Sequence, residues 1–356
     1  MRIIIRDNLS GRKSFLIRIG GVLFALITGA LFLAVAGYNP FSSLASLVEG
    51  AFGTTKRIVE TIEFAIPLVI TSLGISLAFR MKFWNIGAEG QICMGAFAAS
   101  YFALFHADWP LGLLYLAMIA SALIAGALWA AIPALFKVKW GTNETLVTLM
   151  FNYVALKFIE YLQHGPWKDP NASGFSKIAM FDTKVLLPRV LGVNIGWIVA
   201  LVLIVVMYFF VDRSKAGYRI KVIGESIDTA RYAGINVPRT MVLTVCMGGA
   251  LAGLTGMIQA TGVERTLNVS LSAGYGYTAI ITAWLARLNP IATGIVCVLF
   301  AALIQGGEFI QTAYNIPNAA AKVFQGLILL FVLGCEFFMR YKVIFGKASV
   351  EGRDAE

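Results

Sequence analysis

Three polar side chains stand together in the glycine-rich run Trp84–Phe97, WNIGAEGQICMGAF. They are Asn85, Glu89 and Gln91. A carboxylate buried in an apolar segment is costly, so it normally faces water or protein, where it binds a polar solute or satisfies backbone groups. Two interpretations of Glu89 therefore stay open. It is either a solute-path or gating residue, or a cap that pairs with the amides of a broken helix.

A second polar group lies further along the chain, within TNETLVTLMFNYVAL. Asn143 and Glu144 precede an apolar segment, and Asn152 and Tyr153 lie inside it. All four are candidates for the same path. Asn143 is equally suited to cap the following helix, with Glu144 favoured by the helix dipole.

The elements that position these residues are predicted to be membrane helices. The chain is 58% hydrophobic and only 13% charged, with a mean hydropathy of +0.78, which excludes an ordinary soluble domain. About 20 apolar residues cross a bilayer as a helix. We therefore predict an all-α polytopic membrane protein of about ten helices with glycine-interrupted or re-entrant segments. The predicted helices are Phe15–Ala36, Ile58–Phe79, Gly87–Phe105, Leu111–Phe136, Thr145–Leu162, Ile195–Val211, Met241–Ala260, Tyr275–Ala286, Ile291–Ile310 and Ala320–Phe338.

The distribution of basic residues predicts the orientation. With a cytoplasmic N-terminus, 20 of the 29 Lys and Arg fall in cytoplasmic segments, and the opposite orientation reverses this ratio. The net charge of +10 therefore reflects the two membrane sides and does not indicate nucleic acid. We expect cytoplasmic segments at 1–14 and 339–356, a transmembrane domain at 15–338, an external loop at 164–194 and a cytoplasmic loop at 212–240.

The cytoplasmic loop contains a polar, basic segment punctuated by glycines, GYRIKVIGESIDTARYAGINVPR at Gly217–Arg239. A short helix is predicted over Ser226–Ala233, ended by Gly234 in the left-handed conformation and by Pro238. This helix lacks the bulky apolar face of a lipid-surface anchor, so contact with a protein partner is the favoured interpretation.

Glycines and other small residues recur at three- and four-residue spacing in SALIAGALWAAI, Ser121–Ile132, and in GGALAGLTGMI, Gly248–Ile258. Such stripes allow helices to approach closely and suit a transporter built from two repeats. The four cysteines, Cys93, Cys246, Cys297 and Cys335, lie in apolar segments without metal-like spacing and are predicted to be core residues. The run Ala34–Ala36 resembles a signal-peptidase site, but the preceding apolar segment is longer than the ~7–15 residues typical of a signal.

The chain resembles bacterial ATP-binding-cassette importer permeases of the branched-chain amino acid, ribose and nucleoside group, and within them the nucleoside permeases. The resemblance covers about 80% of the chain and rests on motifs in family order: NIGAEGQ at Asn85–Gln91, TNETLVTLMFNYVAL at Thr142–Leu156, TARYAGI at Thr229–Ile235, GGALAGLTG at Gly248–Gly256 and LNP at Leu288–Pro290. One departure is AWLAR at Ala283–Arg287, where the family tends to have a smaller, Gly-containing run.

The resemblance implies a multi-pass inner-membrane subunit that imports a nucleoside or simple sugar by alternating access. It also implies a cytoplasmic ATP-binding-cassette subunit, a second permease subunit and an extracytoplasmic substrate-binding protein as partners. The coupling residues implied by the family are Gly224, Glu225, Thr229, Ala230, Arg231, Tyr232 and Gly234. The sequence has no phosphate-binding GxxxxGK[ST] motif, so ATP-Mg is expected on the partner, and this chain is expected to be a transport subunit without enzyme activity or cofactor.

Two other functions compete with the importer. An ion-coupled secondary transporter also uses broken helices and buried carboxylates, but it works alone and needs no partner socket. A membrane-embedded enzyme needs a cluster of His, Asp or Cys at one interface, and the sequence offers none. Co-purification with a cytoplasmic ATPase distinguishes both rivals from the importer.

Overall fold

The computed structural model describes residues 37–172 and 174–314 without interruption. It also describes two short terminal strands and separate short stretches between residues 20 and 35 and between 323 and 334. Two compact units make up the chain, and each is described by itself. One contains residues 52–302, and the other contains residues 1–51 and 303–356. About half of the predicted helix Phe15–Ala36 lies outside the described residues, and its described residues are helical. Most of the predicted helix Ala320–Phe338, and Cys335, lie outside the described residues.

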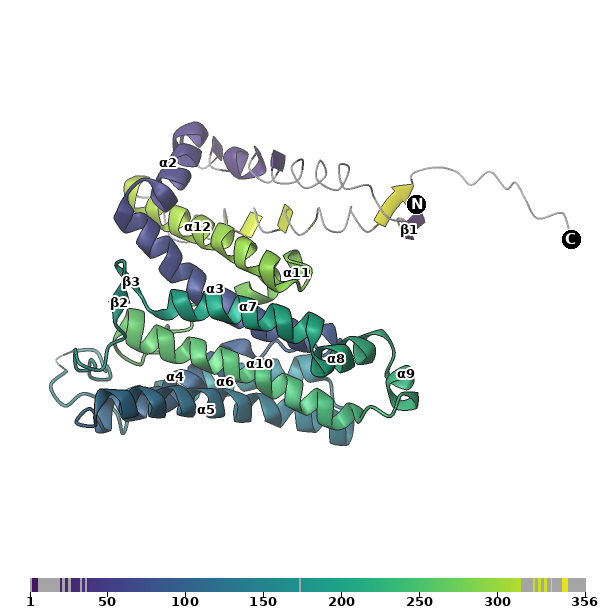
Figure 1. Cartoon of the computed structure of the whole chain (residues 1–356). Helices are drawn as coiled ribbons and strands as arrows, with labels where there is room; N and C mark the ends of the chain where they lie inside the picture. Colours follow the sequence, from purple (N-terminus) through teal and green to yellow (C-terminus); the bar gives the residue numbers. More distant parts are fainter. Residues whose placement is uncertain are drawn as a thin grey trace, which may run out of the picture. The chain divides into compact units, whose positions relative to one another are not determined.

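The larger unit is a helical bundle (Figure 1). Its elements are α3 (Thr55–Arg80), α4 (Ala88–Phe105), α5 (Leu111–Trp140), α6 (Glu144–His164), β2 (Arg189–Val190), β3 (Val193–Asn194), α7 (Gly196–Arg213), α8 (Lys215–Glu225), α9 (Ile227–Tyr232), α10 (Val237–Gln259), the π-helical turn η1 (Ala260–Glu264), α11 (Tyr275–Leu285) and the first part of α12 (Pro290–Tyr314).

In the described part of the chain, six helices are long and apolar enough to cross a membrane: Thr55–Arg80, Leu111–Trp140, Glu144–His164, Gly196–Arg213, Val237–Glu264 and Pro290–Ala313. The predicted segments at α4 and α11 also form helices but do not belong to this set. With 11 residues, α11 extends over only about 16 Å, roughly half of a bilayer core. The predicted count of ten membrane helices is therefore not confirmed, and α11 is too short to span alone.

The core of this unit is centred on α10, which packs against α3, α4 and α5. Glycines make these contacts possible. A methyl group on Gly126 of α5 would lie 2.2 Å from the carbonyl oxygen of Gly249 on α10, and one on Gly95 of α4 would lie 2.2 Å from the Cα of Gly253. The predicted close approach of the two small-residue stripes is confirmed. Whether they belong to an internal repeat stays a prediction.

The smaller unit contains β1 (Arg2–Ile5), α2 (Pro40–Phe52), the later part of α12 and β4 (Tyr341–Ile344). The two strands pair antiparallel, with Arg2 opposite Ile344. These strands and the β2–β3 pair modify the all-α prediction, and α2 was not predicted. In the same unit, Gly50 of α2 lies so close to Phe309 of α12 that a methyl group there would be 2.5 Å from the Phe309 Cβ.

Two loops lie at opposite ends of the larger bundle. Figure 1 shows α8 and α9 at one end of α7 and α10, and the β2–β3 hairpin at the other. The segment 164–194 is folded onto the helices: Ile178, Phe181 and Val185 are buried, and Phe181 N donates to Arg265 O at 2.9 Å. The Lys184 amide donates to the carboxylate of Asp182, and this bond holds the Asp182 pKa below its ordinary value. The long loop is therefore a packed cap.

Candidate functional site

The Glu89 carboxylate joins two helices that are far apart in sequence. Its side chain projects from the first turn of α4 and is 4% exposed. Oε1 accepts a hydrogen bond from Gly274 N at 2.9 Å, and Oε2 accepts one from Gly276 N at 2.7 Å. These amides lie at the start of α11, where a helix has unpaired donors and attracts negative charge. Glu89 therefore caps α11, as the second interpretation of this residue required.

Close packing surrounds this cap. A methyl group on Gly276 would lie 2.4 Å from the backbone nitrogen of Glu89, so only glycine allows α11 to approach α4 this closely. The glycine-rich run at the start of α11 is LSAGYGYTAI, Leu271–Ile280. It provides free amide donors, and its glycine at 276 has no side chain to block the carboxylate.

Asn85 and Gln91 pair with each other at the turn before α4. Asn85 Nδ2 and Gln91 Oε1 are 3.4 Å apart, and Gln91 Nε2 donates to Asn85 Oδ1 at 3.3 Å. Asn85 Oδ1 also accepts from Gly87 N at 2.9 Å. Both side chains are 1% exposed. Their polar groups fix the local turn that carries Glu89.

Asn152 connects α6 to the same turn and to α11. Its Oδ1 accepts from Gly90 N at 2.9 Å, and its Nδ2 donates to Ile86 O at 2.9 Å and to the Tyr277 hydroxyl at 3.3 Å. The side chain is completely buried. Thr148, one turn earlier in α6, accepts from Ile86 N at 3.2 Å. Tyr277 and Thr148 were not among the predicted site residues, although Thr148 lies within the motif Thr142–Leu156 and Tyr277 within the predicted helix Tyr275–Ala286.

The structure divides the predicted path residues into groups. Asn85, Glu89, Gln91 and Asn152 come together, and we call them the Glu89 network. Tyr153 follows Asn152 but is 55% exposed. Asn143 and Glu144 lie at the beginning of α6, more than two helical turns before Asn152.

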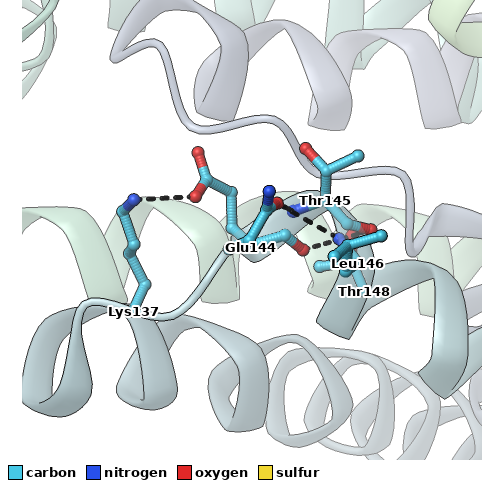
Figure 2. A network of polar contacts seen from close by, with 6 residues as sticks. Lys137, Glu144, Thr145, Leu146 and Thr148 are labelled. Atoms are coloured by element: carbon cyan, nitrogen blue, oxygen red, sulfur yellow. Dashed lines mark hydrogen bonds and ion pairs between the residues drawn. The ribbon is translucent and has the colours of Figure 1, made fainter.

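Asn143 is the N-cap of α6, as its alternative interpretation proposed. Its Oδ1 accepts from Thr145 N at 3.0 Å and from Leu146 N at 3.3 Å. Glu144 forms an ion pair with Lys137 of α5, with Oε2 2.8 Å from Nζ. Figure 2 shows this pair beside the first turn of α6, where Thr148 donates to the Glu144 carbonyl. The α5–α6 turn is thereby held by a charge pair and a cap.

A cavity of about 320 Å³ lies beside this ion pair. Its lining includes Lys137 and Glu144 together with Lys82 from the α3–α4 turn and Glu225 and Ser226 from the α8–α9 junction. The end of the bundle that carries α8 and α9 is therefore hollowed, and charged side chains line the hollow together with apolar ones such as Met81 and Ile227.

The predicted coupling residues lie on α8, α9 and the turn after α9. Ser226 ends α8 and caps α9, with its Oγ accepting from Thr229 N at 3.2 Å. Gly234 has a φ of +74°, as predicted for a left-handed helix end. The predicted helix Ser226–Ala233 is confirmed as α9 within one residue at each end. Helix α8 was not predicted from the sequence.

Burial separates these residues into two kinds. Gly224 and Ala230 are buried and fix the loop to the bundle, whereas Glu225, Thr229, Arg231, Tyr232 and Gly234 are exposed. Tyr232 is 93% exposed. An aromatic side chain held out on a capped helix is typical of a protein contact surface.

Aromatic residues near the Glu89 network already have ring partners. Trp84 stacks on Trp284 with centroids 5.5 Å apart and an interplanar angle of 16°. Phe97 stacks on Trp167, with centroids 5.2 Å apart. The unusual AWLAR run therefore supplies a tryptophan that packs against the α3–α4 turn.

Comparison with known proteins identifies relatives over most of the chain. A family model described as "branched-chain amino acid transport system / permease component" matches residues 57–333. A glucose ABC transporter permease protein of Haloferax volcanii is 30% identical, over 90% of this chain and 88% of the relative. A nucleoside ABC transporter permease protein of Lactococcus lactis is 29% identical, over 90% and 91%. A guanosine ABC transporter permease protein of Bacillus subtilis is 28% identical, over 93% and 95%.

The family match agrees with the arrangement described above, a bundle with six candidate membrane spans and a polar helical loop at one end. The resemblance predicted from the motifs is confirmed. This chain belongs to the family of permease components of the branched-chain amino acid transport system, and is an inner-membrane permease subunit of an ABC transporter.

Proposed function

We propose that this chain is the membrane-spanning subunit of an ATP-driven importer that carries a nucleoside or a related simple sugar by alternating access. ATP-Mg would bind the partner ATPase, because this sequence lacks the phosphate-binding motif. The substrate class is supported by the relatives, two of which are nucleoside or guanosine permeases and one a glucose permease.

Both chain termini and the α8–α9 end of the larger unit are proposed to face the cytoplasm. The excess of Lys and Arg in the corresponding segments supports this orientation. The pairing of β1 with β4 also brings the two terminal segments together, as their location on one side of the membrane requires. The packed loop 164–194 would then receive the substrate-binding protein at the outer face.

The main support for this proposal is that α9 exposes side chains to solvent and that the chain belongs to a family of ABC transporter permeases. Arg231 and Tyr232 project from a helix that is capped at its start by Ser226 and stopped by Gly234. A rigid helix with an exposed aromatic group and a cation suits insertion into a cleft on a cytoplasmic ATPase. Closure of the ATPase would then move α8 and α9 and rock the membrane helices.

The Glu89 network is proposed to line or gate the path between this chain and a second permease subunit. Its bonds join α4, α6 and the start of α11, so a relative movement of these helices must break or exchange them. In a folded complex, Glu89→Gln is expected to slow ATP-coupled uptake, and unchanged uptake would rule out gating by this carboxylate.

The first experiment measures ATPase activity in a complex purified through this chain and reconstituted in lipid. The wild type is compared with Glu225→Ala combined with Gly234→Pro. Proline cannot adopt the positive φ of Gly234, so α9 would be distorted where it meets the ATPase. We expect weaker assembly and loss of turnover stimulated by the substrate-loaded binding protein.

Gly174→Pro is the matched control. Gly174 also has a positive φ, +93°, but it lies in the loop at the opposite end of the bundle. This variant is expected to retain the ATPase subunit, and it controls for assembly alone, because its loop is the one proposed to receive the substrate-binding protein. If the wild-type chain purified without any ATPase and transported its substrate alone, the importer proposal would fail and an ion-coupled carrier would replace it.

A further inference from the structure

The end of α8 lies directly against the end of α3. A methyl group on Gly224 would be 1.8 Å from the carbonyl oxygen of Arg80, well inside any permitted contact. Arg80 is the last residue of α3, and Gly224 is the penultimate residue of α8. Because Gly224 has no side chain, the α8–α9 loop can contact the backbone of Arg80 directly.

The side chain of Arg80 continues this contact to another part of the bundle. Its Nη2 donates to the carbonyl oxygen of Leu288 at 2.5 Å. Leu288 lies in the turn between α11 and α12. Asp212, at the end of α7, interacts electrostatically with the guanidinium. Arg80 thus connects the base of the α8–α9 loop to the turn that follows α11.

The turn that accepts this bond has an unusual backbone. Arg287 and Leu288 have φ values of +52° and +58°, a region that residues with a side chain seldom adopt. Such conformations persist when the surrounding structure holds them. Leu288 also closes this turn through its own amide, because Leu288 N donates a hydrogen bond to Ala283 O at 2.9 Å. A hydrogen bond from Arg80 is therefore well placed to select this turn conformation.

The short helix α11 is consequently held from both ends. Glu89 binds its first amides, and Arg80 binds the turn after its last residue. Between them, Ser72 of α3 donates to Ala279 O at 3.2 Å and lies 2.6 Å from the Thr282 hydroxyl. One short helix, α11, therefore connects the Arg80–Leu288 contact to the Glu89 network.

We propose that Arg80 is a positioning residue that transmits movement of the α8–α9 loop to α11, with Gly224 as the contact through which the loop acts on it. This inference rests on the proposed function, in which α9 binds the ATPase. In this proposal the Arg80–Leu288 hydrogen bond holds α11 in the position seen in this structure, and movement of α8 against the Arg80 backbone weakens that hold. Coupling between distant sites requires such an element with two arrangements that both sites bias.

A purely structural role is the alternative. A cation at a helix C-terminus stabilises the helix dipole, and a buried guanidinium anchors a loop, whether or not the loop moves. The two roles differ in what is lost on substitution. A structural anchor affects assembly and every activity together, whereas a transmitting residue affects communication in a complex that is still assembled and still hydrolyses ATP.

The test uses the lipid-reconstituted complex and compares the wild type with Arg80→Gln and Arg80→Lys. Arg213→Gln, at the exposed end of α7, is the control for loss of a cation at the same end of the bundle. Three quantities are measured: recovery of the ATPase subunit, basal ATP hydrolysis, and stimulation by binding protein loaded with substrate. We expect Arg80→Gln to retain the first two and to lose about fivefold or more of the stimulation. Arg80→Lys keeps the charge and one donor, and should recover part of it.

Full stimulation of an assembled Arg80→Gln complex would overturn the inference. If Arg80→Gln does not assemble, Arg80→Lys decides: an assembled but unstimulated complex supports transmission, and a normally stimulated one shows that Arg80 serves stability alone. Failure of both variants to assemble also assigns Arg80 to the fold. Failure of the proposed function is recognised separately, because the wild-type chain would then purify without an ATPase.

Discussion

The Glu89 network and the α8–α9 loop are both polar, but they differ in what satisfies their polar groups. In the network, Glu89 and Asn152 are buried and bind backbone amides of other elements. In the loop, Arg231 and Tyr232 are exposed, and Arg231 has Asp228 as its neighbour at 3.5 Å. Buried polar groups are costly unless they are paired within the chain, whereas exposed ones are paired with water until a partner arrives. Residue types in the network are therefore set by the fold, whereas those exposed in the loop are available for the proposed contact with a partner.

The strongest test of this contrast is removal of the Glu89 carboxylate. Glu89→Ala would leave the Gly274 and Gly276 amides without their acceptor, at a cost of about 1–3 kcal/mol for each buried donor. We expect a large fall in thermal stability of the detergent-solubilised chain, monitored by the loss of helical circular dichroism. Glu89→Gln retains one acceptor oxygen and should be less damaging. Equal stability of wild type and Glu89→Ala would show that the network does not hold α11.

A change in the loop should produce the opposite pattern. Tyr232→Ala removes a side chain that is 93% exposed, so the free energy of unfolding should change by less than about 0.5 kcal/mol. If Tyr232 is an anchor of the interface, affinity for the ATPase should fall by about tenfold or more. Binding of the purified ATPase to the reconstituted chain measures this. Tyr218, 65% exposed on α8, provides the matched Tyr→Ala control. Undiminished affinity would place the contact elsewhere.

The Lys137–Glu144 ion pair is intermediate in solvent exposure between the Glu89 network and the α8–α9 loop. Its loss should change the free energy of unfolding only slightly, the smallest effect of the three tests. Its side chains are 35% and 10% exposed. Partly solvated ion pairs contribute about 1 kcal/mol or less. A double-mutant cycle with Lys137→Gln and Glu144→Gln isolates the coupling from each residue's other contacts. We expect a coupling of this size that decreases with added salt. A coupling free energy of several kcal/mol would show that this ion pair behaves like the buried Glu89 network.

Much of the fold was predictable because hydrophobic segment length and glycine placement act locally. The predicted helices at 87–105, 111–136 and 241–260 correspond to α4, α5 and α10 within a few residues. The missed helix α8 has the polar, basic composition of a loop, and its N-cap, Ser214, is a weak signal alone. The bounds predicted for α11, Tyr275–Ala286, also agree within one residue, but the apolar composition of this segment does not reveal whether so short a helix crosses the membrane.

The candidate site was predictable in its residue types but not in its pairings. Asn85, Glu89 and Gln91 stood out because polar residues are rare in apolar segments. Their capping role depends on Gly274 and Gly276, nearly 200 residues later, and the sequence does not reveal which amides will be free. Asn143 was the easier case, since an N-cap acts on the residues immediately after it.

The sequence by itself determined the membrane class, the family and the short helix with its left-handed stop at Gly234, because composition, ordered motifs and helix capping are local properties of the chain. Only the tertiary structure showed that Glu89 binds amides at the start of α11, that the loop 164–194 packs against the helices, and that Gly224 contacts the backbone of Arg80. These outcomes depend on close approach of segments distant in sequence, and that approach is set by how the helices pack, not by any one segment's own preferences.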